Sequence, residues 1–225
     1  MEDLDRVTSS RELGARQLQD LAAIGVTSDH DVIWQSERFA TYNSVIDDLT
    51  SRGLTYECFC SRKEIREAAS APHGDFYERV YPGTCRDLTV SERRERAKSR
   101  PAAIRLRSNL AEASFTDALQ GMYEGQVDDV VLRRNDGVPA YNIAVVVDDA
   151  LQGITQVCRG ADLLSSTPSH IHLQQILGYQ TPEYMHVPLV IGTDGERLSK
   201  RNGAKSLQDY RDAGDTEADV IERLM

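Results

Sequence analysis

The sequence lacks any apolar run long enough to cross a membrane. Its densest apolar stretch, 141–147, has about the length of one buried strand, whereas a membrane-spanning helix needs roughly 18 residues. The first five residues are acidic and contain no apolar core, which excludes a signal peptide. The sequence predicts no membrane partner. With 40% hydrophobic and 28% charged residues, the 225-residue chain fits one globular domain, or one domain with a modest insert.

Basic residues and cysteines are also scarce. The 26 basic residues are outnumbered by 36 acidic ones, and the resulting net charge of −10 argues against a general nucleic-acid coat while permitting a locally basic docking face. Only four cysteines occur, and one is left over if three share a site. This favours a reduced, cytoplasmic protein over a disulfide scaffold.

Both ends of the chain alternate helical and strand patterns, which is typical of an α/β fold. Helical spacing and capping residues predict helices at 9–24, 36–52, 165–177, 206–213 and 216–225. Apolar runs predict strands at 32–34, 141–148, 154–158 and 187–191.

The middle of the chain has a different character. A short strand at 54–59 precedes two small helices, which are expected to begin at the capping boxes Ser61-x-x-Glu64 and Thr89-x-x-Glu92. Strands are then expected at 103–107 and 129–134. No large apolar face occurs between 54 and 100, so this segment is interpreted as an insert stabilised by something other than a core.

Cys58, Cys60 and Cys85 supply three thiolates to this insert. Zinc takes four tetrahedral ligands, usually thiolate or imidazole, so one position is left to fill. On ligand chemistry the fourth ligand is His73, the only histidine between the cysteines, and Tyr81 competes through a harder phenolate oxygen. The alternative interpretation is three unrelated buried thiols.

Two positively charged positions are candidates for binding substrate. Lys200, in a basic loop after a predicted strand, is well placed to reach phosphate oxygens during nucleotidyl transfer, although a solvated turn is the alternative. Arg159 follows a buried strand, where ligands bind in open α/β sheets, and its guanidinium suits a carboxylate. Tyr141 could supply a hydroxyl to the same crevice, and a surface ion pair is the alternative for Arg159.

Two further features are expected to be structural. Cys158 lies in a predicted strand and is interpreted as an inert core thiol. His170 and His172 lie inside a predicted helix and are interpreted as surface histidines.

Taken in order, several segments resemble the class I glutamyl-tRNA synthetase family. They are Glu2-Asp3-Leu4-Asp5, Val145-Val146-Val147-Asp148-Asp149, Gly153-Ile154-Thr155, Val157-Cys158-Arg159-Gly160-Ala161-Asp162-Leu163-Leu164, and the loop Arg197-Leu198-Ser199-Lys200-Arg201 in place of the Lys-Met-Ser-Lys-Ser motif. The order of the matches over nearly the whole chain makes chance a poor explanation.

Within that family the chain is most similar to the short branch, the glutamyl-Q tRNA(Asp) synthetases. The spacing of Cys58, Cys60, Tyr81 and Cys85 matches the zinc site of that branch, and the predicted strand at 141–147 carries valine where longer members tend to carry asparagine. The resemblance favours Tyr81 over His73 as the fourth ligand of one structural Zn²⁺.

This resemblance implies a function. Glutamate is activated with ATP, and with Mg²⁺, to glutamyl-adenylate without tRNA, and the glutamyl group then passes to the queuosine base of tRNA(Asp). By position, Glu2 would pair with the α-ammonium of glutamate, Tyr141 and Arg159 would bind its carboxylate end, and Lys200 would stabilise the phosphates. We expect a monomer.

The resemblance also implies a domain plan: a Rossmann-like catalytic domain at 1–53 and 141–195, a zinc-containing α+β insert of the acceptor type at 54–140, and the signature loop with C-terminal helices at 196–225. Family members begin with a strand bearing R-F-A-P-S-P-T-G and a helix bearing the first signature, and this sequence starts after both. A catalytic fragment of a glutamyl-tRNA synthetase and an inactive tRNA- or zinc-binding remnant are therefore kept as alternatives.

Overall fold

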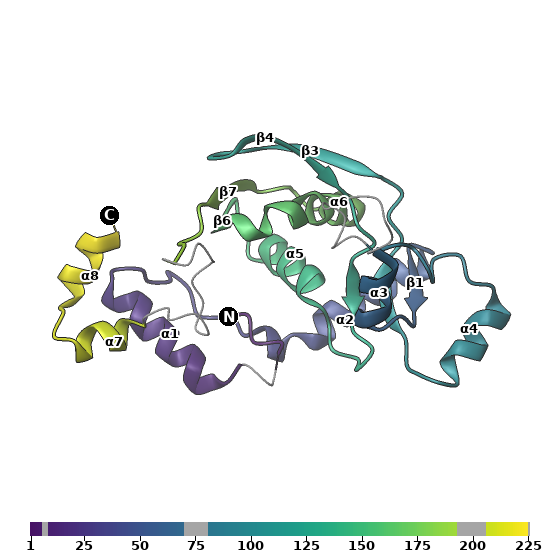
Figure 1. Ribbon diagram of the computed structural model, residues 1–225, viewed down its shortest axis with the longest axis horizontal. Coiled ribbons are helices and arrows are strands. Elements are labelled where there is room, and N and C mark those ends of the chain that lie inside the picture. Colours follow the sequence, from purple (N-terminus) through teal and green to yellow (C-terminus); the bar gives the residue numbers. More distant parts are fainter. Residues whose placement is uncertain (6–8, 70–80, 193–205, 225) are drawn as a thin grey trace. The chain divides into compact units, whose positions relative to one another are not determined.

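The computed structural model describes residues 1–5, 9–69, 81–192 and 206–224 (Figure 1). Contacts divide the chain into two compact units. One combines Met1–Glu37 with Pro188–Met225, and the other is Arg38–Val187. In the part of the chain that is described, no helix has the length and apolar character that a membrane span requires.

The first unit contains helices and irregular chain. Its elements are α1 (Arg11–Ala23), η1 (Gln35–Glu37), α7 (Leu207–Asp212) and α8 (Glu217–Leu224). The predicted strand at 32–34 is wrong, because the N-terminus occupies the backbone there: the ammonium of Met1 donates to the carbonyl of Ile33 over 2.5 Å, and Gln35 N–H donates to the carbonyl of Met1 over 3.1 Å. Asp3 also accepts hydrogen bonds from the backbone N–H and the hydroxyl of Ser36.

The second unit contains two sheets. The smaller one is antiparallel and has the order β1 (Thr55–Cys58), β2 (Ala103–Leu106), β5 (Val131–Arg133). Next to it in sequence are α3 (Arg62–Ala69) and α4 (Val90–Ala97). Both helices begin at the predicted capping boxes: Glu64 N–H donates to the hydroxyl of Ser61, and Glu92 N–H to that of Thr89.

The larger sheet has the order β4 (Gly121–Gln126), β3 (Glu112–Asp117), β7 (Glu183–Val187), β6 (Gln156–Gly160). Strands β6 and β7 are parallel over five residue pairs, whereas β3 joins β7 through the single parallel pair Asp117 and Tyr184. The β3–β4 hairpin, which the sequence did not reveal, packs on α6 (Thr167–Leu177) (Figure 1). The strand expected at 187–191 is wrong, since β7 ends at Val187.

The predicted strand at 141–148 is also wrong: these residues begin helix α5 (Tyr141–Leu151). Ile143, Ala144 and 145–148 are all buried, so the helix is apolar around most of its circumference. A short continuous apolar run does not distinguish a buried helix from a buried strand. The helix packs on α2 (Phe39–Ser51), and on α6.

Two expectations about single side chains fail as well. His170 and His172 are 1% and 5% exposed, because α6 is covered on most sides instead of lying on the surface. Cys158 does lie in β6, but its side chain is exposed, so it is no core thiol. Strand β6 is an edge of the larger sheet.

Candidate functional site

Arg159 lies near the carboxyl end of β6, and its guanidinium is held by three side chains. Its Nε–H donates to Nε2 of His186 over 3.1 Å, and its Nη2–H donates to the hydroxyl of Thr167 over 2.6 Å. Nη1 lies 3.2 Å from Nδ1 of His170. These three partners are at most 1% exposed, so the guanidinium of the half-buried Arg159 is held against the core of the unit.

The partners of both histidines assign their tautomers. Nδ1 of His186 lies 2.6 Å from the carboxylate of Asp117, which only accepts, so the proton is on Nδ1 and Nε2 accepts from Arg159. Nε2 of His170 lies 2.9 Å from Oδ1 of Asn142 and donates to it, so Nδ1 is likewise an acceptor. Burial, followed by the positive charge of Arg159, lowers the pKa of His170 to about 3, which keeps this imidazole neutral at neutral pH.

Arg159 therefore keeps a full positive charge that no carboxylate of the described residues binds directly. Its three direct partners are neutral acceptors, and the ring of Tyr184 lies 5.2 Å from the guanidinium carbon. A surface ion pair, the alternative raised from the sequence, is not formed within the described chain. A cation held in this way at the carboxyl end of a strand suits an incoming carboxylate.

Tyr141 lies beside this group at the first turn of α5. Its ring centroid is 6.0 Å from that of His170, the same imidazole that contacts Arg159. The structure thus brings Tyr141 and Arg159 around one histidine, although the tyrosine begins a helix and not the strand that was expected. The first turn of a helix also carries the positive end of the helix dipole, which favours anions.

The structure does not test the other predicted residues of the substrate site. Glu2 is an exposed residue of the other unit. Arg197, Leu198, Ser199, Lys200 and Arg201 lie outside the described residues, as does His73.

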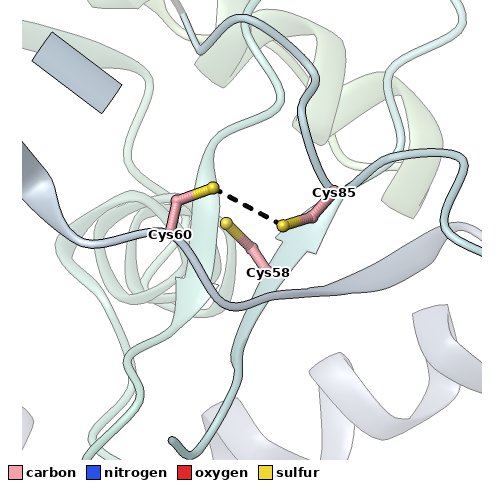
Figure 2. A group of neighbouring side chains, drawn as sticks. All are labelled: Cys58, Cys60 and Cys85. Atoms are coloured by element: carbon pink, nitrogen blue, oxygen red, sulfur yellow. Dashed lines mark hydrogen bonds between the residues drawn. The ribbon is translucent and has the colours of Figure 1, made fainter. Parts of the chain in front are cut away.

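A second cluster brings three cysteines together beside the smaller sheet (Figure 2). The sulfur atoms of Cys58, Cys60 and Cys85 all lie within 4.8 Å of one another, and those of Cys60 and Cys85 are 3.5 Å apart. A tetrahedral zinc with Zn–S bonds of about 2.3 Å separates its sulfur ligands by roughly 3.8 Å. The spacing of the thiols therefore fits a metal of that size without a large rearrangement.

The hydroxyl of Tyr81 completes the cluster. It lies 3.4 Å from the sulfur of Cys58 and 3.5 Å from that of Cys60, and it accepts a 2.8 Å hydrogen bond from Cys85 N–H. The guanidinium carbon of Arg105 is 3.8 Å from the centroid of its ring. Four potential ligands, three sulfur and one oxygen, thus converge on one point.

The protonation of this cluster depends on burial. Burial raises the pKa of the Cys60 thiol to about 11, and burial together with the neighbouring thiols raises the pKa of Tyr81 above its ordinary value. At Cys85 burial opposes ionisation, but hydrogen bonds, first from Phe59 N–H and then from Tyr81, outweigh it and lower the pKa. A divalent cation would supply the charge that ionises the other groups.

The cluster also contributes to a small apolar core. Tyr56, Phe59 and Leu88 are at most 9% exposed and pack with the cysteines and Tyr81. The insert thus has more of a core than its sequence suggested, although four of the six buried members of that core are potential ligands or lie next to one in sequence.

Sequence reasoning missed Asp117, Thr167 and His186, and it misassigned His170. No local pattern marks these residues, because the residues that meet at Arg159 come from separate elements. His186 lies in β7, a strand that was expected at 187–191, and Asp117 ends the first strand of a hairpin that was not expected.

Comparison with known proteins gives a consistent result. The family described as "tRNA synthetases class I (E and Q), catalytic domain" matches residues 1–225. The chain is 53% identical to the glutamyl-Q tRNA(Asp) synthetase of Nocardia farcinica, over all of this chain and 71% of that protein. It is 47% identical to that of Cutibacterium acnes, over 98% of this chain and 63% of that protein.

A longer relative and a solved structure agree with this. The glutamate–tRNA ligase of Geobacter sulfurreducens is 37% identical over 95% of this chain, which spans 46% of that protein. The crystal structure of a glutamate tRNA ligase from Elizabethkingia meningosepticum in complex with its amino acid superposes with a TM-score of 0.72 at 28% identity, over 90% of this chain and 45% of that one. The chain therefore spans less than half the length of these ligases.

Proposed function

Because the chain belongs to the class I tRNA synthetases of the E and Q type, we propose that it activates L-glutamate with ATP and transfers the glutamyl group to the queuosine base of tRNA(Asp). The family makes it a ligase of the aminoacyl-tRNA synthetase type. The observation that carries the proposal is the environment of Arg159. This half-buried cation is held only by neutral acceptors among the described residues. Identities of 53% and 47% to proteins named for the queuosine reaction support this choice of acceptor.

The proposed roles follow the resemblance. Arg159 and Tyr141 bind the carboxylate end of glutamate, and Glu2 pairs with its α-ammonium. Lys200, within the loop Arg197-Leu198-Ser199-Lys200-Arg201, stabilises the phosphates of ATP as pyrophosphate leaves, with Mg²⁺ as the usual companion of ATP. No covalent enzyme intermediate is involved, so catalysis rests on positioning and electrostatics.

We also propose that Cys58, Cys60, Tyr81 and Cys85 hold one structural zinc ion in the insert at 54–140. The converging sulfur and oxygen atoms support this assignment. Zinc would fix β1 to the turn that carries Cys85, and it would take no part in the chemistry at Arg159.

Glutamate-dependent exchange of pyrophosphate into ATP, measured without tRNA on this chain and on one extended upstream with the first signature of the family, tests activation. Transfer of labelled glutamate is then measured on tRNA(Asp) with and without queuosine. Label that requires queuosine supports the proposal. Label that reaches tRNA lacking queuosine would indicate a glutamyl-tRNA synthetase, and absence of exchange in both chains would indicate a binding remnant.

A further inference from the structure

A buried carboxylate lies directly behind the imidazole that holds Arg159. Asp117, at the end of β3, is 1% exposed, and His186, in β7, is fully buried. Asp117 contacts Nδ1 of His186 over 2.6 Å, and Nε2 of the same ring contacts Nε of Arg159 over 3.1 Å. Through these two contacts, the three side chains connect the β3–β4 hairpin to the carboxyl end of β6.

We propose that Asp117 and His186 are positioning residues for glutamate binding: the carboxylate fixes the imidazole in the tautomer that orients the guanidinium of Arg159. This inference rests on the proposed role of Arg159. Asp117 and His186 themselves touch no substrate in this scheme.

The carboxylate is suited to this task because both of its oxygens are occupied. Oδ1 accepts from the N–H groups of Leu119 and Gln120 over 3.0 and 2.9 Å. The N–H of His186 lies 3.2 and 3.1 Å from Oδ1 and Oδ2, and Oδ2 also accepts from the imidazole. Burial alone would raise the pKa of Asp117, but these hydrogen bonds, led by that of His186, lower it to about 2, so the group is ionised at any working pH.

An imidazole between the carboxylate and the guanidinium has a specific advantage. A carboxylate bonded directly to Arg159 would compete with the carboxylate of glutamate for the same N–H donors. A neutral imidazole orients Nε of Arg159 but leaves the positive charge uncompensated by a direct ion pair. The negative charge of Asp117 fixes the tautomer of His186, and the imidazole ring separates this charge from the guanidinium of Arg159.

Asp117→Asn tests the proposal. Three backbone N–H groups require the single amide oxygen, so the amide NH₂ faces Nδ1 of His186. The ring proton then moves to Nε2, where it opposes the Nε–H of Arg159. We expect the dissociation constant for glutamate, measured by calorimetry, and the glutamate KM in pyrophosphate exchange to rise about tenfold to a hundredfold. The KM for ATP should stay the same.

Gln120→Ala is the matched control. Gln120 lies in the same turn and donates to the carbonyl oxygen of His186 over 2.9 Å, but it does not touch the imidazole. Its removal should leave the affinity for glutamate within about twofold of the wild type. If Gln120→Ala weakened glutamate binding as much as Asp117→Asn, the effect would come from the backbone contact to His186 and not from its imidazole. That result would overturn the proposal.

A measurement on the unaltered protein does not depend on the folding of any variant. The ¹⁵N chemical shifts of the imidazole nitrogens report the tautomer, and we expect a neutral His186 protonated on Nδ1. A proton on Nε2 would refute the inference. In the His186→Gln background, Asp117→Asn should cause little further loss of affinity, because the imidazole that transmits its effect is gone.

The failure of this inference can be told from the failure of the proposed function. If Arg159→Lys leaves glutamate affinity unchanged, Arg159 does not bind the substrate and the proposed role fails. If Arg159→Lys weakens binding but Asp117→Asn changes neither the affinity nor the tautomer, only the positioning role fails.

Discussion

The hydroxyl of Tyr42 in α2 donates a 2.7 Å hydrogen bond to the carboxylate of Asp148 in α5, although 106 residues separate them. Arg38, which precedes α2, donates to the other carboxylate oxygen over 2.8 Å. Asp148 is 5% exposed, and Tyr42 is fully buried. Asp148, which belongs to the segment Val145–Asp149 of the family resemblance, thus connects helix α5 to helix α2.

Replacement of this carboxylate should be costly. Asp148→Ala leaves a buried hydroxyl and a partly buried guanidinium without their acceptor, so the free energy of unfolding should fall by about 3 kcal/mol. Urea titration measures this. Asp48→Ala, which removes only an exposed pair with Arg52, should change stability by less than about 0.5 kcal/mol. Equal effects would show that the Asp148 network is not structural.

Zinc content tests the cysteine cluster. Protein purified without added zinc should contain close to one equivalent by elemental analysis, because four potential ligands converge. Cys85→Ser should abolish retention of zinc, and Tyr81→Phe should weaken it under chelator dialysis. Cys158→Ser, at an exposed thiol, is the control. Full retention in Cys85→Ser with loss in His73→Ala would refute the ligand set.

Arg159→Lys should weaken glutamate binding specifically. Lysine keeps the charge but loses the planar fork, and the loss of a buried carboxylate clamp costs about 2 kcal/mol or more. The glutamate KM should therefore rise at least about thirtyfold, and the melting temperature should change little. Cys158→Ser, at the neighbouring exposed position of β6, should leave both quantities unchanged. A large fall in melting temperature with unaltered kinetics would assign Arg159 a structural role alone.

The contribution of Asp117 to stability should depend on pH. Its pKa is lowered from 3.8 to about 2, so the folded state favours the ionised form more than the unfolded state does. The stabilisation is therefore complete above about pH 4 and is lost as pH falls through the folded-state value. Asp117→Asn and the wild type should differ by a constant free energy of unfolding near neutrality and converge toward pH 2. A difference independent of pH down to that value would contradict the assignment.

The sequence alone supports a prediction about Lys200. A lysine that meets the phosphates mainly in the transition state should affect turnover more than glutamate binding. In the chain extended upstream, Lys200→Ala should reduce pyrophosphate exchange about 10²- to 10³-fold while glutamate affinity stays nearly constant. Lys205→Ala, just outside the motif, should be tolerated. Small and equal effects at both lysines would identify a solvated basic turn.

Elements with local signals were predictable. The capping boxes at Ser61 and Thr89 each gave the start of a helix, because a hydroxyl and a carboxylate three residues apart satisfy the first N–H groups wherever the helix packs. Spacing alone also brought Cys58, Cys60 and Cys85 into one proposed site.

Elements that depend on tertiary contacts were not predictable in this way. The run at 141–148 is apolar on all sides because other helices cover it, and such a run carries no period. The β3–β4 hairpin is mostly exposed and polar, so its strands lack the usual apolar face. Asp117 and His186 are 69 residues apart and meet only because β3 lies parallel to β7.

The pairing of β3 with β7 limits how far the cysteine-bearing segment can be treated as a removable module. A chain in which residue 53 was joined directly to 141 would lose the hairpin, expose the inner edge of β7, and leave the buried ring of His186 without its carboxylate. A graft of the cysteine cluster into another protein would have to omit 112–126, since β3 and β4 belong to the larger sheet, but keep β5, which belongs to the smaller one. The segment at 54–140 therefore cannot be removed without damage to the rest of the unit, because the β3–β4 hairpin within it is part of the larger sheet.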